Sequence, residues 1–170
     1  CRGFQDFKLE LAQQLASSPS QGRIAVTDTD SIKDYTFKVF DTTIDTLLKV
    51  RDNLILENLD AAISAIHNSR RVEFYGFGAS AAVAFDAQHK FFRLQITASA
   101  YADPHLQNMS ATSLEPGDVA VAISQSGRSI ALLDSMELVK NSGGIVIGIA
   151  PTNSPVAAAA TIPIQVDSQD

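Results

Sequence analysis

Three serines, a glutamine and a glycine lie within six residues of the chain, in the segment SQSGRS at 124–129. Short hydroxyl side chains and the free amides at a helix N-terminus are donors that suit the oxygens of a phosphate group. The segment follows the apolar run VAVAIS at 119–124 and leads into a helix-compatible stretch at 128–140. This order of strand, serine-rich turn and helix predicts a phosphate-binding loop.

A second segment of the same kind, YGFGASAA at 75–82, follows the apolar run 71–77. Gly76 and Gly78 allow the backbone to turn sharply and approach a ligand, and the residues after them open a helix whose free amides can receive an anion. Ser80 and Ser126, taken singly, could equally be N-caps that satisfy these amides. Two such loops at neighbouring strand ends are less easily explained as two separate caps, which favours a joint phosphate site.

The elements that position these loops are predicted by short, mostly continuous apolar runs, which are typical of strands buried on both faces. The runs are 71–77, 94–101, 119–124, 144–150 and 161–166. Helix-compatible stretches at 79–92, about 107–114 and 128–140 separate the first four. The pattern predicts an α/β fold in which helices sandwich a five-stranded parallel sheet in three layers, like Rossmann or flavodoxin folds. Ligands of such sheets bind outside the carboxyl ends of the strands.

Helices are also expected before the sheet. Apolar residues recur at helical spacing from 35 to 51, and Asn58 is expected to cap a second helix that runs to about residue 68. A short amphipathic helix is predicted within 4–15, followed by a linker of turn-forming residues at 17–22. The run AAAA at 157–160 predicts a small helical turn.

Composition limits the classes of function. The 170 residues are 45% apolar, enough for one core, and the net charge of −6 disfavours a nucleic-acid-binding surface. Cys1 is the single cysteine, so no intrachain disulfide is possible, and no apolar run approaches the ~20 residues of a membrane span. We expect a cytoplasmic protein with no cofactor and no metal site, because histidine and cysteine lack metal-ligand spacing. The start at cysteine and the end without a closing helix suggest a fragment of a longer chain.

Other motifs give weaker interpretations. The dinucleotide fingerprint G-x-G-x-x-A is matched by Gly76, Gly78 and Ala81. It also requires an acidic residue about 20 residues later, at the end of the next strand, and Asp103 is the one candidate. Asp103 lies in a predicted loop, where a role in a turn suits it better. A nucleophile elbow at Ser80 would need a downstream acid and histidine, whereas the last histidine is at position 105. The dinucleotide and hydrolase interpretations are therefore disfavoured.

The two loops resemble those of the sugar isomerase (SIS) domain. In the glucosamine-6-phosphate synthase members of that family the second loop is Ser-Gln-Ser-Gly-x-Thr, and this chain has Ser129 in place of the threonine, which keeps the hydroxyl. The resemblance implies that the loops hold a sugar phosphate. The implied phosphate-binding residues are Gly78, Ala79, Ser80, Ser124, Gln125, Ser126, Gly127 and Ser129.

The wider segments FYGFGASAAVAFDAQHKFFRL, FDTTIDTLL and DFKLELAQQLA are similar to RpiR-type bacterial transcription regulators, in particular to the HexR-like branch. That resemblance implies that 1–22 are the tail of an N-terminal helix-turn-helix domain plus a linker, and that 23–170 are a SIS domain, truncated at its C-terminal end. Operator DNA would bind through the missing domain and not through this segment. The implied effector is a phosphorylated sugar or sugar acid, 2-keto-3-deoxy-6-phosphogluconate for this branch. Weaker candidates for its sugar-acid end are Arg128, Lys90, Arg93, Tyr101 and His105.

The main alternative is an aldose-ketose isomerase of sugar phosphates on the same fold, since fold alone does not decide function. Isomerisation needs a base near the phosphate loops, and Glu137 and Glu115 are both poorly placed for it in the sequence. We therefore expect no catalytic residues in this segment. Dimerisation through the helices predicted at 35–51 and 58–68, or a higher homo-oligomer, is expected to transmit ligand binding to DNA.

Overall fold

The computed structural model describes residues 25–167, and the chain divides into two compact units, 1–51 and 52–170. Helix α2 (Ile32–Asn53) confirms the helix predicted at 35–51. The helix predicted within 4–15 and the linker at 17–22 lie outside the described residues. Within 25–167, no helix is long and apolar enough to cross a membrane.

The second unit is built on a parallel five-stranded sheet. Its strands are β1 (Val72–Gly76), β2 (Ala98–Tyr101), β3 (Val119–Ile123), β4 (Ile145–Ala150) and β5 (Ile162–Gln165). They lie in the order β2-β1-β3-β4-β5, and every neighbouring pair is parallel. The predicted α/β fold is therefore confirmed.

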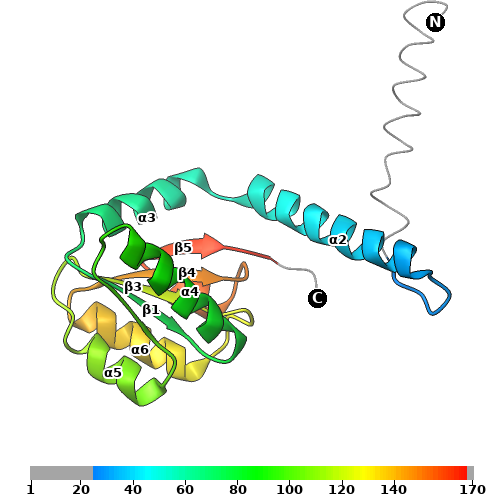
Figure 1. Cartoon of the computed structure of the whole chain (residues 1–170). Helices are drawn as coiled ribbons and strands as arrows, with labels where there is room; N and C mark the ends of the chain where they lie inside the picture. The colour runs from blue at the N-terminus through cyan, green and yellow to red at the C-terminus, as the bar shows by residue number, and fades with distance from the viewer. Residues whose placement is uncertain (1–24, 168–170) are drawn as a thin grey trace, which may run out of the picture. The chain divides into compact units, whose positions relative to one another are not determined.

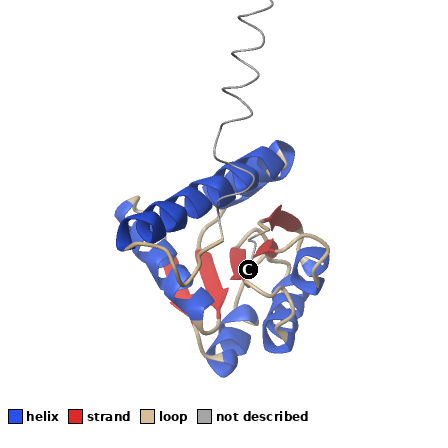
Figure 2. Ribbon diagram, turned by 90° about the vertical axis from the view of Figure 1, so that its right-hand side faces the viewer, coloured by secondary structure: helices blue, strands red, loops and turns tan. Residues whose placement is uncertain are grey.

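Helices cover both faces of the sheet (Figures 1 and 2). They are α3 (Leu56–Asn68), α4 (Ala79–Arg93), α5 (Pro104–Ala111), α6 (Ile130–Asn141) and α7 (Pro155–Ala159). Buried residues of α3 and α4 share one core cluster, and those of α5, α6 and α7 share the other. The sheet is thus the middle of three layers, which explains why its strands are apolar on both faces.

Alternation along the strands sends side chains to the two cores. In β3, Val119, Val121 and Ile123 face the cluster under α3 and α4. Ala120 and Ala122 face the cluster under α5, α6 and α7, where large side chains such as Leu132 and Met136 fill the space. Both faces of β3 are therefore apolar, and its polar residues begin only where the strand ends, at Ser124.

Three predicted boundaries are wrong. Asn58 does not cap α3, because the helix already begins at Leu56. The side-chain amide of Asn58 instead donates to the Pro163 carbonyl at 2.9 Å. β2 begins only at Ala98, because the chain is still turning at Gln95, which has φ 61°. α5 begins at Pro104 instead of about 107, because the Asp103 carboxylate caps it by accepting from the Leu106 amide at 2.9 Å and proline is favoured in the first helical turn.

An ionic cluster closes the amino edge of the sheet. The buried carboxylate of Asp118, just before β3, accepts from Arg70 Nη2 at 2.8 Å, Arg71 Nε at 3.3 Å and the Glu115 amide at 2.9 Å. Burial alone would raise the pKa of Asp118, but the hydrogen bonds from Arg70 and Glu115 and the two guanidinium charges outweigh it, so this pKa is lowered. The cluster ties the start of β3 to the start of β1.

We predict that Asp118→Asn lowers the free energy of unfolding by about 1 to 3 kcal/mol at pH 7, because it removes a charged acceptor from these hydrogen bonds. Since the folded-state pKa of Asp118 lies below its unfolded value, the carboxylate stabilises the fold above about pH 4, and this stabilisation is lost as the pH falls through the lowered pKa. Denaturant titrations from pH 3 to 7 measure the difference. Asp86→Asn, which breaks an exposed pair with Lys90, is the matched control with little effect. The prediction would be contradicted if the difference in free energy of unfolding between the wild type and Asp118→Asn were the same at every pH.

Candidate functional site

The first loop leaves the sheet at Gly76, the last residue of β1. A Cβ atom at this position would lie 2.7 Å from the Ser80 carbonyl oxygen, so only glycine lets the first turn of α4 pack against the strand end. Gly78, with φ 55°, is the N-cap residue of α4. Ser80 lies inside the first turn and its amide donates to the Phe77 carbonyl at 3.0 Å. The N-cap interpretation of Ser80 is therefore wrong, and its hydroxyl is not the helix cap.

The second loop leaves the sheet at Ile123, which is the ladder partner of Gly76. Ser124 Oγ accepts from the Gly127 amide at 3.0 Å, and Ser126 Oγ accepts from the Arg128 amide at 3.3 Å. A hydroxyl that accepts from a backbone amide keeps its own hydrogen, so both side chains still have a donor to offer a ligand.

Ser129 ends the second loop as the N-cap residue of α6. Within the described part of the chain, its hydroxyl makes no capping hydrogen bond. α6 itself begins at Ile130, close to the predicted start at 128 or 129. The Ser129 hydroxyl is therefore a further donor or acceptor at the helix N-terminus.

Gly127 fixes the second loop against its neighbour, the turn after β4. Its φ is 63°, and a Cβ atom there would overlap Cβ and Oγ of Ser154. The Gly127 carbonyl accepts from the Val156 amide at 3.0 Å, while Ser154 Oγ caps α7 by accepting from the Ala157 amide at 3.2 Å. The serine-rich loop thus takes its shape partly from α7, which is distant in the sequence.

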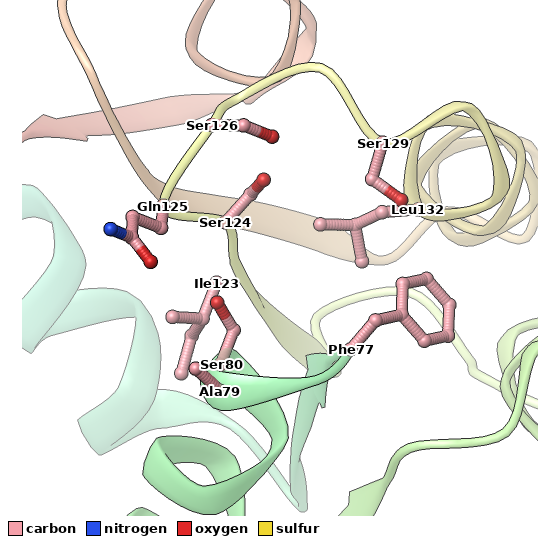
Figure 3. Close-up of a pocket in the computed structure, with 9 residues that line it drawn as sticks. All are labelled: Phe77, Ala79, Ser80, Ile123, Ser124, Gln125, Ser126, Ser129 and Leu132. Atoms are coloured by element: carbon pink, nitrogen blue, oxygen red, sulfur yellow. The ribbon is translucent and has the colours of Figure 1, made fainter.

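The two loops line one pocket at the carboxyl edge of the sheet, with a volume of about 310 Å³ (Figure 3). We call it the first lobe. Its lining residues are Phe77, Ala79, Ser80, Ile123, Ser124, Gln125, Ser126, Ser129 and Leu132. Figure 3 shows Ser80 entering from the start of α4, facing the serines that come from the loop after β3. The structure therefore places the predicted loops side by side.

A second lobe of about 260 Å³ adjoins the first. The residues that line both lobes are Ala79, Ser80, Ile123, Ser124 and Gln125. Those that line only the second are Val83, Ile149, Ala150 and Val166. The hydroxyl groups are concentrated in the first lobe, and the second is mostly apolar.

The described residues that line both lobes all have neutral side chains. Positive potential comes instead from the positive ends of the α4 and α6 dipoles, since both helices begin at the first lobe. At α4 the Ser80 and Ala81 amides already donate to the Phe77 and Gly78 carbonyls, so the amides available to a ligand are those of the first turn of α6. Hydroxyls and amides that converge on one space suit an anion with several acceptor oxygens. The arrangement can bind such an anion, and none of its lining residues within 25–167 carries a carboxylate or imidazole for proton transfer.

The structure brings together most of the predicted phosphate-binding residues. Six of them line the first lobe, namely Ala79, Ser80, Ser124, Gln125, Ser126 and Ser129. Gly78 and Gly127 shape the adjoining turns without lining it. Sequence reasoning missed Phe77, Ile123 and Leu132, whose apolar side chains form the walls. Leu132 follows Ser129 by one helical turn, a spacing that could have indicated it.

The weaker candidates do not line either lobe. Lys90 and Arg93 lie in the last turn of α4, about 15 and about 20 Å beyond Ser80 along the helix axis, and Lys90 pairs with Asp86 at 2.5 Å. The Tyr101 ring packs edge-on against a buried tyrosine.

The last two weaker candidates, His105 and Arg128, are exposed. Asp103, the acid required by the dinucleotide interpretation, is the α5 cap already described. These positions leave the dinucleotide interpretation without its ribose-binding acid.

Comparison with known proteins agrees with this geometry. The family model of the SIS domain matches residues 65–170. In sequence, the chain is 41% identical over 167 residues to the bifunctional protein glk of Burkholderia thailandensis, covering 98% of this chain and 26% of that protein. It is 39% identical over 160 residues to the HTH-type transcriptional regulator HexR of Pseudomonas aeruginosa, covering 94% and 56%. The chain thus spans between about a quarter and just over half of these relatives.

Among solved structures, the Vibrio vulnificus NanR protein complexed with ManNAc-6P superposes with a TM-score of 0.74 at 23% identity. The match covers 98% of this chain and 58% of that protein. At this identity the likeness shows a common fold.

We predict that Gly127→Ala lowers the free energy of unfolding by about 2 kcal/mol more than Gly117→Ala. Both glycines have positive φ, so both variants carry backbone strain of about 1 to 2 kcal/mol. Only at Gly127 does the new methyl group also meet Ser154, and overpacking typically costs about 1 to 3 kcal/mol. Urea denaturation of both variants measures the difference. Equal losses would show that the contact with Ser154 is not a tight constraint.

Proposed function

Because the chain belongs to the SIS domain family, we propose that its first lobe binds the phosphate group of a phosphorylated sugar or sugar acid, and that the domain senses this effector for a DNA-binding transcription regulator. The observation that carries the proposal is the convergence of two glycine-serine loops on one pocket lined by four hydroxyls. The similarity to the HTH-type transcriptional regulator HexR supports the regulatory role. For the effector we propose 2-keto-3-deoxy-6-phosphogluconate, the compound that the resemblance of the sequence to the HexR-like branch implies.

Phosphate would be held without a cationic side chain. Ser80 would donate from the side of α4, while Ser124, Ser126 and Ser129 would donate from the other loop. The Gly127 and Arg128 amides already donate to Ser124 Oγ and Ser126 Oγ, so they orient these hydroxyls for the phosphate. Each charge-assisted hydrogen bond contributes about 1.5 to 3 kcal/mol. Several such bonds are enough for reversible binding of a metabolite.

Sensing is favoured over isomerisation by the neutral lining of both lobes. Moving a proton between neighbouring carbons requires a base within hydrogen-bonding reach of the substrate. Glu137 is exposed on α6, and Glu115 lies in the turn before β3 at the other edge of the sheet. Glu73 is buried within β1, and its carboxylate accepts from Tyr75 and Ser110. These carboxylates are engaged or distant from the lobes, so binding without turnover is the better supported activity.

In the whole protein, operator DNA would bind through a helix-turn-helix domain that precedes this unit, with residues 1–22 as its tail and linker. The net charge of −6 is consistent with DNA contacts made elsewhere.

Dimerisation would use α2 and α3. On α2, eight large apolar side chains are exposed, namely Ile32, Tyr35, Phe37, Val39, Phe40, Ile44, Leu47 and Leu48. The ligand regulates DNA binding if it binds one arrangement of the dimer more tightly than the other.

We predict that Ser80→Ala and Ser126→Ala each weaken the binding of inorganic phosphate and of 2-keto-3-deoxy-6-phosphogluconate about tenfold or more, because each removes one charge-assisted hydrogen bond. Isothermal titration calorimetry measures the affinities. Ser64→Ala, on the exposed side of α3, is the matched control and should bind like the wild type. Unchanged affinity in both loop variants, or no binding of any phosphorylated compound, would contradict the phosphate site.

We also predict that the domain binds hexose and pentose phosphates without converting them, since its lobes lack a lining base. Proton NMR of sugar phosphates incubated with the protein measures conversion, with a sugar-phosphate isomerase as the positive control. If the protein formed a ketose phosphate from an aldose phosphate faster than the reaction without protein, the isomerase function would be supported and the sensor function contradicted.

A further inference from the structure

The second lobe differs in chemistry from the first. Its own lining residues, Val83, Ile149, Ala150 and Val166, are all apolar. They come from α4, from the end of β4 and from the residue after β5, so the lobe is assembled by the sheet order and not by a local motif. Among the residues that the structure describes, the polar side chains that line this lobe are those on the border shared with the first lobe, Ser80, Ser124 and Gln125.

An apolar lobe discriminates between parts of a carbohydrate. Each methylene group that it removes from water contributes about 0.8 kcal/mol, equivalent to about threefold to fourfold in affinity. A hydroxyl group placed there loses its hydrogen bonds to water, and only the border residues could replace them. A carboxylate would be disfavoured still more, because none of the described lining residues is cationic. The lobe therefore selects an uncharged segment without hydroxyl groups.

We propose that the second lobe is a subsite for such a segment of the ligand, either deoxygenated carbon or an alkyl or acyl substituent, on the molecule whose phosphate occupies the first lobe. The two lobes adjoin along five common lining residues, and this adjacency carries the assignment. It rests on the proposed phosphate site and adds the class of ligand: a phosphorylated carbohydrate that is deoxygenated or acylated on the side facing β4. A second anionic group of the ligand, where present, lies outside this lobe.

Linear alkyl phosphates test the subsite without knowledge of the natural ligand. We expect affinity to rise about threefold to fourfold per methylene from methyl to butyl phosphate, as the chain extends from the first lobe into the second. Erythritol 4-phosphate, with hydroxyl groups along a chain of similar length, should bind no more tightly than methyl phosphate. Calorimetry or ligand-detected NMR gives the affinities, with inorganic phosphate as the reference.

The variant Val83→Thr/Val166→Thr keeps the side-chain shape and adds two hydroxyl groups to the lobe. It should bind inorganic phosphate as tightly as the wild type does. Its affinity should rise about threefold or less in total from methyl to butyl phosphate, because the added hydroxyl groups make the lobe less favourable for methylene groups. The matched control is Ile63→Thr, since Ile63 is an exposed β-branched residue of α3 that lines neither lobe. This variant should keep the full rise in affinity from methyl to butyl phosphate.

The outcomes separate the two proposals. If inorganic phosphate binds but affinity does not rise with chain length, or if the double variant keeps the full gain, the subsite is wrong and the phosphate site stands. If neither inorganic phosphate nor any organic phosphate binds, the phosphate site fails and the subsite with it.

Discussion

The parallel ladder between β1 and β3 is the constraint on which the pocket depends. Gly76 and Ile123 are partners in that ladder, so the residues after them leave the sheet side by side. Because the strands are parallel, the following helices both begin at this edge and direct the positive ends of their dipoles toward the same space. Two loops separated by more than 40 residues of sequence thereby become one site.

The tightness of the loops depends on small residues and on one distant contact. At Gly76 the strand end touches the backbone of the first turn of α4, and at Gly127 the serine loop touches Ser154 at the start of α7. A side chain at either glycine would push a loop away from the sheet edge. The hydroxyls of Ser124 and Ser126 are held by amides of their own loop, which orients them before a ligand arrives and reduces the entropy lost on binding.

Much of this arrangement could be predicted from the sequence, and the rest depends on contacts that are not local. Continuous apolar runs predicted the strands, and glycine and serine at their ends predicted the first lobe. The start of α5 differs from the prediction because the sequence analysis places Asp103 in a loop, whereas its carboxylate caps a helix whose first residue is Pro104. The second lobe could not be predicted, because Ile149 and Val166 come next to Ser124 only through the order β3-β4-β5. The same holds for the contact of Gly127 with Ser154.

An NMR titration of the amide resonances with inorganic phosphate shows whether both loops bind one phosphate group together. We expect the amides of Ala79 and Ser80 and those of residues 125–129 to shift along a single saturation curve with one dissociation constant. Shifts confined to one loop, two different dissociation constants for the two loops, or shifts elsewhere on the domain would contradict it.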